Sequence, residues 1–212
     1  MIPIARHLWR RPHYRWRQII AARVAAIVSA CVTAAFLAPC GIAAEPHFDP
    51  VTGYRIARYQ AAVPESPPAG QRVWIDQIDK LLAEENAVLI DVSPIVGAGY
   101  DPATGRWRNS NNHTSLPGAV WLPDVGRGVL DAPLEHYYRT EMHRLTAGNL
   151  DRPVVLFCYA DCWMSWNAIK RAATLGYTRL YWFPEGTNGW TDFDRKLVPV
   201  DPVPVDVGPS NR

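Results

Sequence analysis

A segment near the carboxyl end of the chain has the pattern of a fully buried strand that leads directly into a helix. Residues 154–159 are all apolar or aromatic, and the helical pattern of residues 162–175 is closed by Gly176. A strand without polar positions is typical of a parallel sheet that helices cover on both faces. The segment therefore indicates an α/β fold.

Strands and helices alternate over residues 73–195, which predicts one domain built on a five-stranded parallel sheet with helices on both faces. The flanking segments, residues 45–72 and 196–212, are rich in proline. We expect an irregular N-terminal arm outside the core and a C-terminal tail without a helix. The predicted strands are 73–75, 87–92, 118–122, 154–159 and 177–183, and the predicted helices are 76–85 (capped by Asp76), 134–146 and 162–175, with a long loop over 93–116.

The first 44 residues form a different kind of segment. Residues 1–17 carry five arginines and no acid, and an alanine-rich apolar stretch follows over residues 19–38. This order predicts a signal peptide that is cleaved after Ala43 or Ala44 and directs the protein to the bacterial periplasm. After cleavage we expect no membrane insertion; the alternative is that the segment remains as a membrane anchor.

Removal of the signal peptide changes the charge and the cysteine content of the chain. Six arginines leave with residues 1–44, so 16 of the 22 basic residues remain against all 20 acidic ones. A mildly acidic domain without a basic patch argues against a nucleic-acid partner. Cys31 and Cys40 also leave, so Cys158 and Cys162 become the only cysteines of an exported protein and can pair in an oxidising compartment.

These two cysteines lie at the carboxyl end of a predicted strand, where α/β proteins commonly have their functional sites. Cys158 is at the end of the apolar strand, and Cys162 stands where the following helix should begin. The free N–H groups and the dipole of a helix N-terminus favour a thiolate there. A disulfide between the two residues requires the loop to curl back, because disulfide-bonded Cα atoms are about 5.5 Å apart.

Several segments, in this order, resemble a rhodanese domain over residues 73–195. They are the strand into Asp91, the stretch Leu116-Pro117-Gly118-Ala119, which is similar to the rhodanese "IPGA" segment, the strand into Cys158, and residues 185–190. More narrowly, residues 158–168 closely resemble the CXXCW-motif proteins associated with PQQ-dependent catabolism. That resemblance implies an exported rhodanese-like protein that accompanies a periplasmic quinoprotein dehydrogenase or a cytochrome in alcohol oxidation.

The cysteine loop departs from the sulfurtransferase pattern. The resemblance places the persulfide cysteine at Cys158, with a glycine three residues on and an arginine five residues on, but Asp161 and Trp163 stand there. A carboxylate in place of a cation disfavours a thiosulfate dianion, so thiosulfate transfer is not expected to be the main activity. We take Cys158 and Cys162 as the catalytic residues and Asp161 and Trp163 as residues that tune them. Of the two tryptophans at helical spacing, Trp166 is expected to be the core residue.

Three hypotheses remain open. The first is that Cys158 and Cys162 exchange between dithiol and disulfide with a partner, which requires the sulfur atoms to be neighbours and exposed; its counterpart is an inert structural disulfide. The second is copper binding by the two thiolates with His113 from the long loop. The third is a rhodanese-like interaction module without catalysis. Asp91, at the end of its strand, is expected to be structural.

Overall fold

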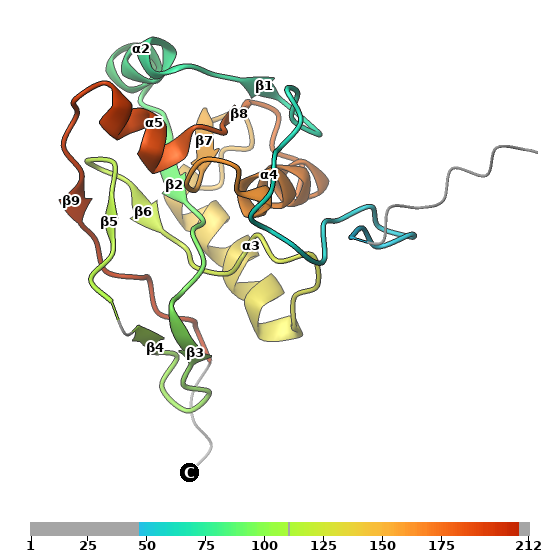
Figure 1. Cartoon of the computed structure of the whole chain (residues 1–212). Helices are drawn as coiled ribbons and strands as arrows, with labels where there is room; N and C mark the ends of the chain where they lie inside the picture. The colour runs from blue at the N-terminus through green and yellow to red at the C-terminus, as the bar shows by residue number, and fades with distance from the viewer. Residues whose placement is uncertain (1–46, 110, 208–212) are drawn as a thin grey trace, which may run out of the picture. The chain divides into compact units, whose positions relative to one another are not determined.

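The computed structural model describes residues 47–109 and 111–207, so the predicted signal peptide lies outside the described residues. The described chain forms a five-stranded sheet in the order β1-β8-β7-β2-β6, and every neighbouring pair is parallel (Figure 1). The predicted α/β fold with a five-stranded parallel sheet is confirmed. The strands are β1 (Gln71–Arg72), β2 (Val88–Asp91), β6 (Val120–Trp121), β7 (Val154–Phe157) and β8 (Leu180–Phe183).

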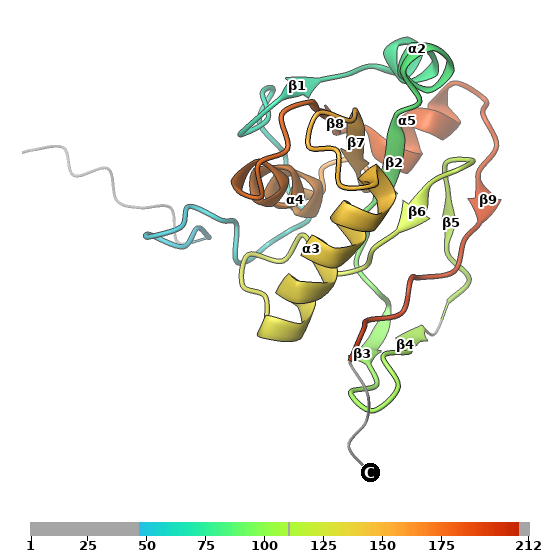
Figure 2. The same ribbon diagram turned by 180° about the vertical axis from the view of Figure 1, so that it is seen from behind.

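Helices cover both faces of this sheet, and an apolar cluster lies between the sheet and the helices on each face (Figures 1 and 2). Side chains alternate along a strand, so Val155 and Phe157 of β7 enter one cluster while Val154 and Leu156 enter the other. This explains why all four residues of β7 are buried. On the first face lie α2 (Ile75–Glu85) and α5 (Gly186–Asp192), and on the second lie α3 (Ala132–Thr146) and α4 (Trp163–Thr174).

The first strand and helix begin earlier than predicted. The helix α2 starts at Ile75 with Trp74 in the cap position, so Asp76 belongs to the first turn and is not the cap. The side chain of Gln77 accepts a hydrogen bond from Trp74 N at 2.8 Å, which closes the helix start. The prediction of a strand over residues 73–75 was wrong because a short apolar run fits a buried helix start as well as a strand.

The long loop and the tail contain short strands that the sequence pattern did not indicate. The tail follows the edge of the main sheet, where Val203 N donates to Trp121 O at 3.1 Å and Val205 is buried. Backbone groups at the edge of β6 are therefore paired, which removes a site for unwanted strand association. The added strands are the antiparallel pair β3 (Gly97–Tyr100) and β4 (Trp107–Asn109) and the antiparallel pair β5 (Thr114–Ser115) and β9 (Val198–Pro199).

The N-terminal arm is irregular, as expected, but part of it belongs to the core. Residues 47–70 form turns, bends and single bridges only. Arg55 is buried, and Tyr59 packs against the cluster between the sheet, α3 and α4. The side-chain amide of Asn167 on α4 accepts from Arg55 N at 2.9 Å and donates to Arg55 O at 2.8 Å. This clamp on the backbone draws the arm into the domain, contrary to the expectation that it stays outside the core.

Candidate functional site

The two cysteines of the motif lie at the junction of β7 and α4. Cys158 directly follows β7, and Cys162 occupies the cap position of α4. They form a disulfide with their Cα atoms 6.2 Å apart. Asp161 has a φ of 56°, a left-handed conformation that aspartate tolerates better than most residues. This residue allows the short loop to curl back so that the two cysteines meet.

The start of α5 supports the loop. Thr187 N donates to Cys158 O at 2.9 Å, and Asn188 Oδ1 accepts from Ala160 N at 2.9 Å. Gly186 has a φ of 52°, and a Cβ atom at this position would collide with the carbonyl oxygen of Cys158. Sequence reasoning had missed these contacts. The Gly-Thr-Asn order at positions 186–188 is the signal that could have shown them, since it combines a close approach with a side-chain acceptor.

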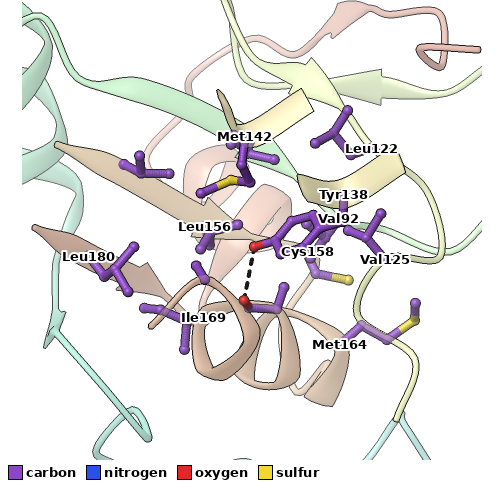
Figure 3. Packing of buried hydrophobic residues seen from close by; sticks show 14 of the residues in the cluster. Val92, Leu122, Val125, Tyr138, Met142, Leu156, Cys158, Met164, Ile169 and Leu180 are labelled. Atoms are coloured by element: carbon purple, nitrogen blue, oxygen red, sulfur yellow. Dashed lines mark hydrogen bonds between the residues drawn. The ribbon is translucent and has the colours of Figure 1, made fainter. Parts of the chain in front are cut away.

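Both cysteine side chains are buried. Cys158 is 0% exposed and Cys162 is 1% exposed. Figure 3 shows Cys158 among Val125 and Tyr138 in the cluster between the sheet, α3 and α4. The sulfur atoms are neighbours, as the exchange hypothesis requires, but the expectation that they are exposed was wrong. Cys158 continues the alternation of β7, so its side chain points into the same cluster as Leu156.

Residues 59–63 of the arm, which we call the strap, lie across the cysteine loop. Their contacts are mostly made by the main chain, and the side chain of Gln60 adds a hydrogen bond to Ala160 O at 3.1 Å. The strap therefore covers the loop mainly through its main chain, and the side chains of Tyr59 and Val63 add packing against the cluster. The backbone contacts are those of an antiparallel strand pair: the bridge between Gln60 and Cys162, the hydrogen bond from Ala61 N to Asp161 O (3.0 Å), and the hydrogen bond from Trp163 N to Tyr59 O (2.8 Å).

Trp163 anchors the arm. Its indole N–H donates to Ala62 O at 3.1 Å, the guanidinium carbon of Arg55 lies 4.8 Å from its ring centroid, and Phe48 meets it edge-on at 5.2 Å. Trp163 is 7% exposed, whereas Trp166 is only partly buried. The expectation that Trp166 is the more buried of the two was therefore wrong, because the arm covers the face of α4 on which Trp163 lies.

The arrangement of a cysteine after β7, a backbone-supported loop and a following helix agrees with a comparison against protein families. The model of the rhodanese-like domain matches residues 75–193, which run from α2 to α5 and include both cysteines. The chain belongs to the rhodanese-like domain family. No curated protein matches it in sequence.

Some solved structures resemble the chain over part of its length. A complex of EanB with hercynine covers 63% of the chain at 17% identity and a TM-score of 0.40, and the chain spans only 32% of EanB. A thiosulfate sulfurtransferase from Pseudomonas aeruginosa covers 63% of the chain at 18% identity and a TM-score of 0.39, with 20% of its own length matched. The human single-domain sulfurtransferase TSTD1 covers 57% of the chain at 20% identity and a TM-score of 0.35, with 95% of its own length matched.

A cation that sequence reasoning missed lies near the loop of this rhodanese-like domain. Arg127, in the turn after β6, forms an ion pair with Asp124 at 3.0 Å. Burial raises the pKa of Asp124, and Arg127 opposes that shift. Burial also raises the pKa of Tyr159 in the cysteine loop, again against the effect of Arg127. Within the loop itself, Asp161 is exposed and acidic.

A second polar group lies at the same end of the sheet but on the other face. Asp91 is buried and accepts hydrogen bonds from Ser93 N (2.8 Å), His113 Nε2 (2.8 Å) and Ser115 Oγ (2.6 Å). Asp91 is in register with Phe157, so its side chain faces the α2 side, while Cys158 faces the α3 side. Asp91 thus holds the loop that follows β2, in agreement with the expectation that it is structural.

The copper hypothesis loses its third ligand in this geometry. His113 binds Asp91 and stacks on Trp121 at 4.0 Å between ring centroids, on the face of the sheet away from the cysteines. Within residues 47–109 and 111–207, no three side chains of His, Cys, Asp or Glu come together as a metal-binding group. In the same part of the chain, no helix has the length and apolar character needed to cross a bilayer.

Proposed function

We propose that this rhodanese-like protein exchanges the Cys158–Cys162 disulfide with thiols of a partner protein after the arm that covers the buried sulfur atoms has moved. One observation carries the proposal: the cysteine at the end of β7, which the family resemblance assigns to a persulfide, is bonded to a second cysteine at the cap of α4. A helix N-terminus stabilises a thiolate at Cys162 once the bond opens. A dithiol in such a place is suited to accept or donate two electrons.

Thiosulfate transfer is a poorer fit to the same residues. While its sulfur is bonded to Cys162, Cys158 has no free thiolate to accept a sulfur atom. If the bond were opened and a persulfide formed on Cys158, Cys162 could attack it and restore the disulfide. Asp161 adds a negative charge to the loop, which opposes the approach of a dianion.

The cellular setting is proposed from the resemblance to the CXXCW-motif proteins. We place the protein in the periplasm, exported by the signal peptide over residues 1–44, where it would serve a quinoprotein dehydrogenase or a cytochrome of PQQ-dependent alcohol oxidation. An oxidising compartment supports a disulfide that must be regenerated after each exchange.

Measurement of the reduction potential tests the exchange. The protein is equilibrated with dithiol redox buffers, and the free thiols are labelled and counted by mass spectrometry. We expect a potential above about −300 mV, in the range of exchangeable disulfides. A lower potential would show that the disulfide is structural and would contradict the proposed exchange. Retention of copper by the reduced protein would favour the metal hypothesis instead.

Burial of both sulfur atoms favours a second candidate, an interaction module without chemistry. A strain that carries Cys158→Ser together with Cys162→Ser separates the two candidates. Loss of growth on alcohol, with the variant protein present at normal level, supports exchange. Normal growth supports the interaction module.

A further inference from the structure

The strap makes the contacts that an extended polypeptide would make with the cysteine loop. Resting on the proposed thiol exchange, we propose that the strap occupies the docking groove for an extended segment of the partner, and that the cysteine of this segment lies where Gln60 lies now. Cys162 is then the sulfur that meets the partner, and Cys158 is the leaving sulfur.

The first support is the register of the strap. Gln60 lies directly opposite Cys162, and the flanking hydrogen bonds belong to the residues on either side of Gln60. In this type of antiparallel pair the two side chains lie on the same side, with Cα atoms about 4.5 Å apart, which suits an inter-strand disulfide. A cysteine at the position of Gln60 therefore lies opposite Cys162, whereas one at Ala61 lies opposite Asp161.

The second support is the kind of contact that holds the strap. The groove offers the carbonyl of Asp161, the N–H of Trp163 and the indole N–H of Trp163, and all three are paired with main-chain atoms of the strap. Recognition through the main chain accepts many sequences, as in other cases of strand addition. A partner segment can replace the strap without loss of these hydrogen bonds.

The third support is the burial of the disulfide. Tyr59 and Val63 of the strap pack against the cluster that contains both cysteines, which are at most 1% exposed. A thiol can reach Cys162 only after the strap has moved. The strap therefore limits exchange to partners that can displace it, which protects the disulfide from small thiols.

The exchange step balances within the groove. The thiolate of the partner cysteine attacks Sγ of Cys162, a bond forms between these two sulfurs, and the Cys158–Cys162 bond breaks. The electron pair leaves on Sγ of Cys158, which takes up a proton from water. The partner cysteine is oxidised and Cys158 is reduced. A second thiol of the partner then attacks the mixed disulfide and releases Cys162 as a thiolate.

A matched pair of proline variants of the full chain tests the groove. Ala61→Pro removes the backbone N–H that donates to Asp161 O. Ala62→Pro is the control: it removes a backbone N–H that makes none of the strap's hydrogen bonds to the loop, and it keeps the carbonyl that accepts from the Trp163 indole. The probe is the peptide of residues 57–63 with cysteine in place of Gln60. We expect its mixed disulfide to form about fivefold faster with Ala61→Pro than with the wild type or Ala62→Pro, the effect of one hydrogen bond.

Peptide mapping and a binding measurement complete the test. The mixed disulfide should be on Cys162, and a peptide with its cysteine at the position of Ala61 should react more slowly. Equal rates for the two proline variants, or attachment to Cys158, would overturn the inference. A fluorescent peptide of residues 57–63 that keeps Gln60 reports the groove without chemistry, and it should bind Ala61→Pro about fivefold more tightly than the wild type. If this peptide binds but no thiol opens the disulfide, the proposed exchange function is wrong and the docking groove is kept. If the peptide does not bind, the proposed docking groove is wrong.

Discussion

The N-terminal arm and the C-terminal tail have similar compositions but cover different parts of the molecule. Both are rich in proline and run over the surface of the domain. The tail pairs with β5 and β6 and buries Val205 in the cluster between the sheet, α3 and α4. The arm crosses the disulfide loop and is held by Asn167 and Trp163 of α4. The comparison teaches that two proline-rich segments of similar composition can cover different features, here a sheet edge and a disulfide loop.

Loss of the arm and loss of the tail should therefore expose different parts of the protein. Removal of the tail exposes backbone groups of a sheet edge and apolar side chains, which lowers the free energy of unfolding. Removal of the arm also exposes a disulfide. Measurements of global stability and of the rate of disulfide reduction by dithiothreitol thus distinguish the arm from the tail.

The largest effect is expected for Trp163→Ala, which removes the anchor of the arm. Loss of a buried tryptophan should lower the free energy of unfolding by about 3–5 kcal/mol, as measured by urea unfolding. The folded fraction should lose its disulfide to dithiothreitol at least about tenfold faster, because the arm opens more often. A reduction rate equal to that of the wild type in the folded protein would show that the arm does not control access.

Val205→Ala makes the corresponding change in the tail. Loss of two buried methyl groups should cost about 1.5–2 kcal/mol, seen as a lower midpoint of thermal unfolding. The rate of disulfide reduction should be unchanged under conditions where the protein is folded, because the tail makes none of the hydrogen bonds that hold the strap on the cysteine loop. Faster reduction in this variant would contradict the separation of the two covers.

Two tyrosine variants give a closer comparison, since each removes one hydroxyl group. Tyr59 Oη accepts from Gly128 N at 2.9 Å in the arm, and Tyr137 Oη donates to Val203 O at 2.8 Å in the tail. Tyr59→Phe and Tyr137→Phe should each lower the free energy of unfolding by about 1 kcal/mol. Only Tyr59→Phe should speed reduction of the disulfide, by up to about fivefold; the opposite ranking would assign the control of access to the tail.

The smallest effect concerns the turn beneath the arm. Burial raises the pKa of Asp124, so ionisation of this carboxyl group costs more free energy in the folded than in the unfolded protein. The ionised carboxylate destabilises the protein above the folded pKa, and this cost disappears as the pH falls toward the ordinary value of 3.8. Asp124→Asn should therefore raise the stability at pH 7 by only about 0.5 kcal/mol, because loss of the ion pair with Arg127 offsets part of the gain. Urea unfolding at pH 7 and pH 4 measures the change, and a loss of stability at pH 7 would show that the ion pair with Arg127 outweighs burial.

Local patterns predicted most of the sheet. The strands β2, β6, β7 and β8 and the helices α3 and α4 were located because apolar runs and helical periodicity are properties of short segments. The start of α2 was misplaced because an apolar run of three residues does not distinguish a strand from a buried helix start. The helix α5 and the short strands of the loop and tail were not predicted, since their stability comes from contacts with distant segments.

The sequence by itself determined the α/β class, the resemblance to rhodanese domains, and the place of Cys158 and Cys162 between a strand and a helix. Only the tertiary structure decided that both sulfurs are buried, that the strap lies across Cys162, and that His113 belongs to Asp91 on the other face of the sheet. The physical reason is that such contacts depend on strand register and on which face a side chain enters. A shift of the strand register by one residue would turn each side chain to the other face and change its contacts, although the local sequence pattern would stay the same.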